Sequence, residues 1–151
     1  MAYIFLMAAV LVADQISKYT VRTFMSEGES INVIGDFFRL TYYENDGAAF
    51  STLSGQRVIL IMIPAIAIIA GLIYMFKNRN AHPLLHVSIS FIVAGGAGNL
   101  IDRAFFGSVT DMFDFSIFPP IFNVADIFVV IGCGLLVVYI FMYEKLEGKN
   151  D

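Results

Sequence analysis

The stretch that decides the fold is FNVADIFVVIGCGLLVVYIFMY, residues 122–143. Its apolar run is long enough for a helix that crosses a bilayer, which needs about 20 residues. Yet an asparagine and an aspartate, Asn123 and Asp126, stand three residues apart at its start. Moving a carboxylate out of water is costly, or it forces the group to take up a proton. An ionisable side chain kept at such a position therefore indicates a functional site.

The composition of the whole chain is that of a membrane protein. Of its 151 residues, 58% are hydrophobic and only 15% are charged, and the mean hydropathy of +0.77 lies well above that of a soluble domain. The length suits one membrane-embedded domain over residues 1–151. Scattered Lys and Arg residues and a net charge of −4 exclude a nucleic-acid surface. The single cysteine, Cys133, cannot form an internal disulfide.

Four apolar segments are predicted to be transmembrane helices. They cover approximately residues 3–24, 58–76, 84–103 and 122–143. The first has the length of a secretory signal, but no Lys or Arg precedes it and its continuation keeps helical apolar spacing. We therefore interpret it as a span that the mature protein retains.

The cations predict which side of the membrane each loop faces. The connection FKNRNAHP, between the second and third spans, carries two cations and no acid, and the C-terminal tail carries two lysines. By the positive-inside rule, both termini and this connection are cytoplasmic. The loops at about 25–57 and 104–121 then face outward. Asp111 and Asp126 consequently belong to the outer side of the membrane.

The first outer loop is predicted to contain a small sheet. INVI (31–34) and FFRLTYY (37–43) are β-prone runs, joined by Gly35–Asp36, which suits a two-residue hairpin turn. The segment ENDGAAFS (44–51) follows, in which a turn precedes a small apolar patch. We expect this patch to lie near the lipid.

Two groups of polar residues in the spans need an explanation. Asp14 and Lys18 stand four apart on one helix face, and we interpret them as a structural ion pair that faces the bundle interior. In the third span, a stretch of small residues is followed by Asn99, Asp102 and Arg103, which converge on one face at the outer end. Small residues let another backbone approach closely, so this end of the span can hold a polar site.

Asp111 lies 15 residues before Asp126, in the loop that returns from the third span. Two aspartates from separate elements can meet, and two close carboxyl groups then share a proton. Such a pair can activate a water with one member and protonate a leaving group with the other, as in aspartic peptidases. Acid pairs also serve proton relays and ion pathways. A small transporter that uses Asp14, Lys18, Asp111 and Asp126 as a relay therefore stays open at this point.

Other catalytic schemes have no support in the sequence. There is no His-Glu-x-x-His motif, and His82 and His86 have no plausible third metal ligand. A Gly-x-Ser-x-Gly nucleophile elbow is absent. Ser17 and Lys18 are adjacent in a helix, so they point to different faces and do not form a dyad.

Several blocks of the sequence resemble one known family, lipoprotein signal peptidase, also called signal peptidase II. The blocks are DQISK (14–18), NDGAAF (45–50), GGAGNLIDR (95–103), GSVTDMFDF (107–115) and FNVAD (122–126). They follow the family's order and spacing and span most of the chain. Together they are far more specific than any one of them.

The resemblance implies an intramembrane aspartic endopeptidase that removes the signal peptide from diacylglyceryl-modified bacterial prolipoproteins, cutting immediately before the lipidated cysteine. Asp111 and Asp126 match the family's catalytic dyad. The positions that match residues shaping or supporting the site are Asp14, Lys18, Asn45, Gly47, Asn99, Arg103 and Asn123. The family fold has four transmembrane α-helices, a β-cradle on the outer face and a short outer-face helix.

The resemblance also implies partners and a location. No metal or organic cofactor is expected, and the partners are lipid-modified prolipoproteins, membrane lipids and the cyclic peptide antibiotic globomycin, whose hydroxyl is held between the two aspartates. The expected location is the bacterial cytoplasmic (inner) membrane, as a monomer. A noncatalytic scaffold that binds lipoprotein precursors would keep the apolar groove but tolerate Asp111→Asn.

One residue departs from the family pattern. The family commonly has serine after the second aspartate, where this chain has Ile127, so a possible hydrogen-bond partner of the dyad is missing. Asp102 is expected to be a structural partner and Asp114 a loop acid. The NDGAAF loop and the outer sheet are expected to hold the substrate extended by backbone pairing.

Overall fold

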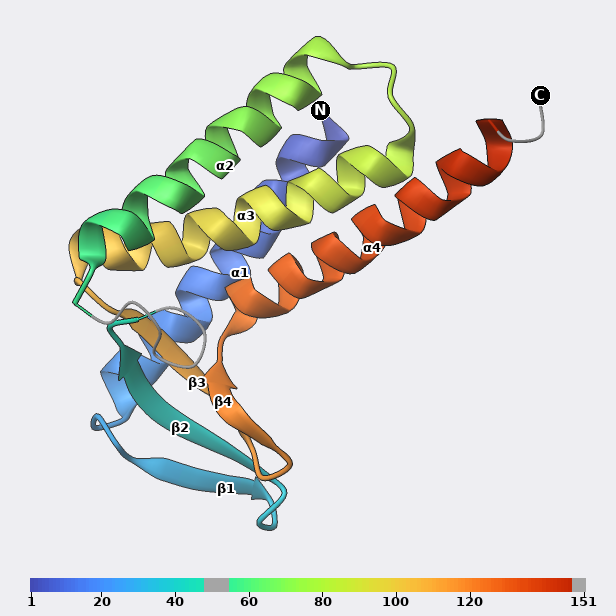
Figure 1. The fold of residues 1–151 in the computed structure, drawn as a ribbon. Helices are drawn as coiled ribbons and strands as arrows, with labels where there is room; N and C mark the ends of the chain where they lie inside the picture. Colours follow the sequence, from blue (N-terminus) through green and yellow to red (C-terminus); the bar gives the residue numbers. More distant parts are fainter. Residues whose placement is uncertain (48–54, 148–151) are drawn as a thin grey trace.

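The structure is a computed structural model that describes residues 1–47 and 55–147, the last five by their backbone alone. The described residues form four long helices and four strands (Figure 1). The helices are α1 (Ala2–Phe24), α2 (Arg57–Lys77), α3 (Pro83–Phe105) and α4 (Val124–Glu147). The strands are β1 (Ser30–Ile34), β2 (Phe38–Asn45), β3 (Val109–Phe115) and β4 (Phe118–Phe122).

All four helices are long and apolar enough to cross a membrane, so the prediction of four spans is confirmed. The observed helices differ from the predicted spans by a few residues at several ends. The third starts at Pro83, where a proline at the first helical position needs no hydrogen bond to its nitrogen. The ring of His82 caps this helix, because its Nδ1 accepts from Leu84 N at 3.2 Å.

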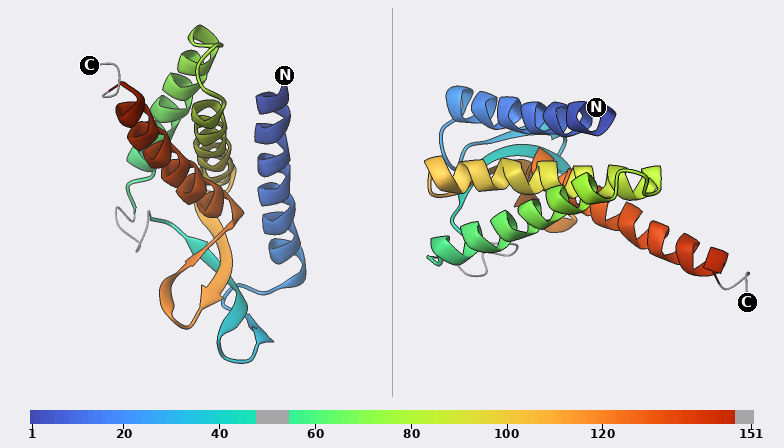
Figure 2. Two further views of the ribbon diagram at one scale, coloured as in Figure 1. Left: turned by 90° about the vertical axis from the view of Figure 1, so that its right-hand side faces the viewer. Right: turned by 90° about the horizontal axis from the view of Figure 1, so that it is seen from above.

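The helix α3 lies in the middle of the bundle and packs against the other three (Figure 2). Glycines make the contact between α3 and α4 close. A side chain at Gly95 would overlap the carbonyl oxygen of Ala125 and the side chain of Val129. On the other helix, a side chain at Gly132 would overlap the backbone of Ser88. The small residues of α3 therefore let the backbones approach, as the sequence predicts.

The strands form one antiparallel sheet in the order β1-β2-β3-β4. Two details of the sequence prediction were wrong. Residues 104–121 are not only a loop, because β3 and most of β4 lie within them. The turn between β1 and β2 has three residues instead of two, because Ile34 pairs with Phe38. Gly35 adopts a φ of 48° in this turn, a conformation that favours glycine.

The sheet lies at one end of the helices (Figure 1). The N-terminus and the connection between α2 and α3 lie at the other end, and α4 runs away from the sheet. The short outer-face helix stays a prediction, because residues 48–54 lie outside the described part of the chain. The apolar patch expected at Ala48, Ala49 and Phe50 falls within the same gap.

Candidate active site

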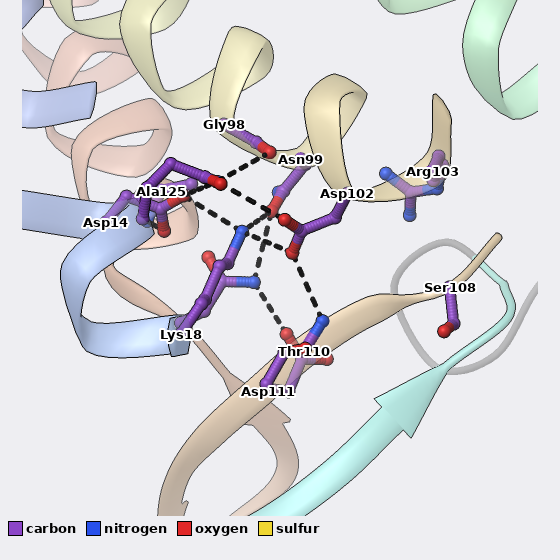
Figure 3. Close-up of polar contacts among 12 residues, drawn as sticks. Asp14, Lys18, Gly98, Asn99, Asp102, Arg103, Ser108, Thr110, Asp111 and Ala125 are labelled. Carbon is purple, nitrogen blue, oxygen red and sulfur yellow. Dashed lines mark hydrogen bonds and ion pairs between the residues drawn. The ribbon is translucent and has the colours of Figure 1, made fainter. Parts of the chain in front are cut away.

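The second half of α1, the end of α3 and the start of α4 meet β3 around a buried cluster of polar side chains (Figure 3). Asp14, Lys18, Asp102 and Asn123 are each 0% exposed, and Asp111 is 2% exposed. Buried charges persist in proteins only when they are paired and hydrogen-bonded. The partners of each member therefore define what the cluster can do.

A single asparagine joins the two candidate catalytic acids. Asn123 Nδ2 donates to Asp111 Oδ1 at 2.6 Å, and the backbone N–H of Asn123 donates to Asp126 Oδ2 at 3.2 Å. Asp111 comes from β3 and Asp126 from the first turn of α4. The structure therefore brings the two predicted acids to opposite sides of one residue.

Asn123 and Asp126 also explain why α4 begins where it does. The backbone N–H of Asp126 donates to Asn123 Oδ1 at 3.0 Å, while the Asp126 carboxylate accepts the N–H of Asn123. This reciprocal pattern is a capping box, which satisfies two N–H groups that a helix start leaves unpaired. The spacing of three in the sequence thus serves the helix start and the candidate site together.

Two further amides complete the surroundings of the acids. Asn45 Nδ2 donates to Asp111 Oδ2 at 2.9 Å, and Asn99 Nδ2 donates to Asp126 Oδ1 at 2.7 Å. Each carboxyl group therefore accepts hydrogen bonds at both oxygens. This fixes the orientation of both groups relative to the protein.

Burial raises the pKa of Asp111 to about 7. The nearby charge of Asp126 also raises it, whereas the hydrogen bonds from Asn45 and Asn123 and the charge of Lys18 lower it. Desolvation disfavours the charged carboxylate, and here it outweighs the donors that stabilise it. Asp111 is therefore able to carry a proton near neutral pH.

Lys18 fixes one of these amides. Its Nζ lies 3.0 Å from Asp14 Oδ2, 3.0 Å from Asp102 Oδ2 and 2.9 Å from Asn99 Oδ1. The ion pair predicted between Asp14 and Lys18 is confirmed, and Asp102 is a structural partner as expected. Because Lys18 has only donors, the oxygen of Asn99 must face it. The Asn99 nitrogen is thereby directed to Asp126.

Asp14 links the first helix to the last. Its Oδ1 accepts the backbone N–H of Ala125 at 2.9 Å, one residue before Asp126. A side chain at Gly98 would overlap the Asp14 carboxylate, so the predicted small stretch of α3 makes room for this acid. Gln15 joins the same network, donating to Asp14 at 3.1 Å and to Asp102 at 3.2 Å. Sequence reasoning missed Gln15, although it sits inside the DQISK block.

Arg103 and Gly47 meet at the edge of the site. Arg103 Nη2 donates to the carbonyl oxygen of Gly47 at 2.6 Å, and the Gly47 N–H donates to Asn45 Oδ1 at 3.0 Å. Arg57 was not predicted, but its Nε donates to the Arg103 carbonyl at 2.9 Å. Arg103 thus ties the end of β2 to the end of α3.

A cavity of about 710 Å³ opens beside the two acids. Its polar lining is Asn45, Asn99, Arg103, Asp111 and Asp126. The rest of its lining is apolar and comes from the sheet and α4: Phe37, Val109, Phe115, Ile117, Phe118, Pro120, Ile121, Phe122, Ile127, Val129, Val130 and Ile131. The cavity therefore suits an apolar chain with a polar group at the acids. The departure from the family pattern, Ile127, lies in its wall.

Asp114 was wrongly predicted to be a loop acid. It lies in β3, is 8% exposed, and accepts from Arg39 at 2.6 Å and from Thr41 Oγ1 at 3.0 Å. It does not line the cavity. Within the described residues, no group of three His, Cys, Asp or Glu side chains is arranged to hold a metal ion.

Comparisons with known proteins agree on one family. A family model described as "Signal peptidase (SPase) II" matches residues 6–142. The chain is 41% identical to the lipoprotein signal peptidase of Brevibacillus brevis, with 97% of both chains covered. It is 44% identical to that of Halothermothrix orenii, with 97% of this chain and 99% of the relative covered.

Solved structures of bacterial membrane enzymes show the same fold. One, at 2.3 Å resolution, gives a TM-score of 0.88 at 35% identity and covers 93% of this chain and 88% of the other. A second, at 1.9 Å resolution, gives a TM-score of 0.84 at 36% identity and covers 92% of each.

Proposed function

The chain belongs to the signal peptidase II family of membrane proteases, and from this premise we propose an aspartic mechanism with a defined cut. The enzyme removes the signal peptide from diacylglyceryl-modified prolipoproteins, cleaving immediately before the lipidated cysteine. Asp111 and Asp126 are the catalytic pair. Asp14, Lys18, Asn45, Gly47, Asn99, Arg103 and Asn123 hold the pair and its surroundings in place.

One observation supports this mechanism above all others. Asp111 and Asp126 accept hydrogen bonds from the same residue, Asn123, at the polar end of an apolar cavity. Two carboxyl groups in such a place share one proton, so that one is an acid and the other a base. We assign the role of the acid to Asp111, because burial raises its pKa to about 7.

The reaction then follows from these roles. Asp126 takes a proton from a water molecule as the water oxygen attacks the scissile carbonyl carbon, and Asp111 gives its proton to the carbonyl oxygen. In the second step the C–N bond breaks and the proton held by Asp126 passes to the leaving nitrogen. Asp111 recovers its proton as the new carboxyl group forms, so the pair returns to its starting state.

The cavity supports an apolar substrate that enters from the membrane. Its walls from β4 and α4 are apolar, whereas its polar groups cluster at the two acids. A lipidated signal peptide presents this pattern, with one polar backbone bond to be cut between apolar groups. We propose that globomycin occupies the same cavity with its hydroxyl between the acids, and that the enzyme works as a monomer.

The chain is a multi-pass membrane protein, and we propose that the sheet and the acids face outward while both termini face the cytoplasm. Two cations at this end of the helices support the orientation: Lys77 ends α2, and Arg79 lies in the α2–α3 connection. A proton-conducting protein would need ionisable groups through the depth of the membrane. Asp14, Lys18 and Asp102 instead contact one another near the sheet, which favours the protease.

The decisive experiment uses the purified protein in detergent with a diacylglyceryl-modified precursor and an unmodified one. Wild type is expected to cut only the modified precursor, at the bond before the cysteine. Asp111→Asn and Asp126→Asn are expected to cut neither. Asp114→Ala is the matched control and is expected to stay active, because Asp114 is a buried aspartate of the same strand that lies away from the cavity.

Three results would count against this function. Cleavage by Asp111→Asn or Asp126→Asn would show that the substituted residue is not catalytic. Equal cleavage of both precursors would show that the enzyme does not require the lipid on the cysteine. Precursor binding by wild type without cleavage would favour the noncatalytic scaffold.

A further inference from the structure

Glu44 lies next to the site, but sequence reasoning did not select it. Both of its carboxylate oxygens accept hydrogen bonds from the start of β3 and the residue before it: Ser108 Oγ donates to Oε2, and Thr110 Oγ1 donates to Oε1 at 2.8 Å. Tyr42 contacts Glu44 from the same strand, and burial together with Glu44 raises the pKa of Tyr42 to about 12. Glu44 therefore clamps the end of β2 to the start of β3.

The two strands are paired in two separate stretches. Leu40 pairs with Phe113, but the next pair is Tyr43 with Asp111, so two residues of β2 oppose one of β3. This extra residue is a β-bulge, which interrupts the ladder locally. The stretch that carries Asp111 contains only three pairs: Tyr43 with Asp111, Glu44 with Thr110, and Asn45 with Val109.

Because successive residues of a strand point to opposite faces, these three pairs divide between two faces. Asn45, Val109 and Asp111 line the cavity. Glu44 and Thr110 face the other way and contact each other. A slip of β2 by one residue along β3 would turn Asn45 away from Asp111, since register decides the face of every side chain.

Thr110 connects this clamp to the helices. It is 0% exposed, and its backbone N–H donates to Asp102 Oδ2 at 3.3 Å. Asp102 in turn contacts Lys18. Glu44 therefore attaches the end of β2 to a strand residue that is itself fixed to α3.

We propose that Glu44 is a positioning residue for the catalytic pair, which sets the register of β2 on β3 so that Asn45 donates to Asp111. This role rests on the proposed function, because it has a consequence for catalysis only if Asp111 is catalytic. Glu44 touches neither the cavity nor the acids. It acts through Asn45, whose amide reaches Asp111 Oδ2 at 2.9 Å.

A matched pair of variants tests this role. Asp114 is also a carboxylate that accepts from two side chains across the same two strands, but beyond the bulge. Glu44→Ala is expected to lower kcat roughly 10- to 100-fold, the effect of a small displacement in an active site. Asp114→Ala is expected to lower the Tm by a similar amount and leave kcat near that of wild type. The KM for the lipidated precursor is expected to change little in both.

Two further readouts separate positioning from general destabilisation. The hydrogen bond from Asn45 lowers the pKa of Asp111, so Glu44→Ala is expected to move the alkaline limb of the pH profile upward, as Asn45→Ala does. The other charged groups near Asp111, namely Asp126, Lys18 and Arg103, are unchanged in this variant. The double variant Glu44→Ala/Asn45→Ala is expected to lose little more activity than Asn45→Ala alone. Both changes remove the same interaction, the hydrogen bond from Asn45 to Asp111.

Glu44→Gln is the conservative control. Its amide can accept from one hydroxyl and donate to the other, since hydroxyl groups do both. Its kcat is expected to stay within about fivefold of wild type, the equivalent of one neutral hydrogen bond. This variant also tests the role if Glu44→Ala does not fold.

The role is overturned if Glu44→Ala and Asp114→Ala lose activity in proportion to their loss of Tm. It is also overturned if Glu44→Ala and Asn45→Ala are additive, or if neither Glu44→Ala nor Glu44→Gln differs from wild type. Failure of the proposed function is seen independently, as cleavage by Asp111→Asn.

Discussion

At the scale of single residues, the proposed mechanism makes activity depend on the proton on Asp111. Its pKa of about 7 is raised mainly by burial. Below that pH Asp111 is protonated and can act as the acid, and above it the proton is lost. We predict that kcat/KM falls about tenfold per pH unit well above pH 7. Initial rates on the lipidated precursor from pH 5 to 9 would measure this, with Asp114→Ala following the wild-type profile.

The same residue makes stability depend on pH. The folded pKa of about 7 exceeds the ordinary value of 3.8, so the folded state binds more protons between these values. The free energy of unfolding contributed by Asp111 therefore falls as pH rises from about 4 to about 7. We predict that the Tm of wild type decreases more between pH 5 and pH 8 than that of Asp111→Asn. Equal pH dependence of the two Tm values would contradict the raised pKa.

Lys18 compensates the charge of two buried carboxylates. Removing one partner of a buried ion pair costs about 3–5 kcal/mol, because the remaining charge stays without compensation. Lys18 contacts both Asp14 and Asp102 at 3.0 Å, so Lys18→Met is expected to lower the Tm strongly and abolish cleavage. The exposed Lys77 provides the control, since Lys77→Met should leave both the Tm and the cleavage activity unchanged. A small change in Tm for Lys18→Met would contradict this role of Lys18.

At the scale of the elements, the contact between α3 and α4 sets the position of Asp126. A methyl group at Gly95 would overlap the Ala125 carbonyl oxygen, whereas nothing lies within 4 Å of one at Gly134. Overpacking of this kind costs about 1–3 kcal/mol. We predict that Gly95→Ala lowers both Tm and kcat, and that Gly134→Ala lowers neither. Thermal unfolding and initial rates in detergent would test this, and a Gly95→Ala variant with wild-type kcat would contradict it.

The helices could be predicted from the sequence because each depends on its own residues. A run of apolar side chains specifies a membrane span locally, and the spacing of Asn123 and Asp126 specifies the capping box. The Asp14–Lys18 pair was also predictable, since both residues stand on one helix face.

The second half of the sheet could not be predicted, because it depends on contacts across the chain. Pro119 and Pro120 argue against a strand, yet β4 lies at the sheet edge, where a strand tolerates proline. The same holds for the individual partners of the site. The contact of Glu44 with Thr110 depends on strand register, and that of Gln15 with Asp102 on helix packing. The DQISK block draws attention to Gln15 but does not give its partner.

At the scale of the whole molecule, the sheet and the α2–α3 connection lie at opposite ends of the helices (Figure 1). The proposed orientation places the sheet outside the cell membrane. We predict that a cysteine at Asp36→Cys reacts with a membrane-impermeant maleimide in intact spheroplasts, and that Asn80→Cys reacts only after lysis. Both variants carry Cys133→Ala, so that the single natural cysteine does not react. The reverse labelling pattern would show that the protein has the opposite orientation in the membrane.

The hydrogen bond from the backbone N–H of Ala125 to Asp14 joins the last helix to the first. Asp126, one of the two proposed catalytic acids, lies on that last helix. During translation, α1 to α3 and β3 are made before α4, which is the last element to leave the ribosome. An unfinished or truncated chain therefore lacks one acid and the backbone partner of Asp14. Under the proposed mechanism, such a chain cannot cut peptide bonds until α4 has been made.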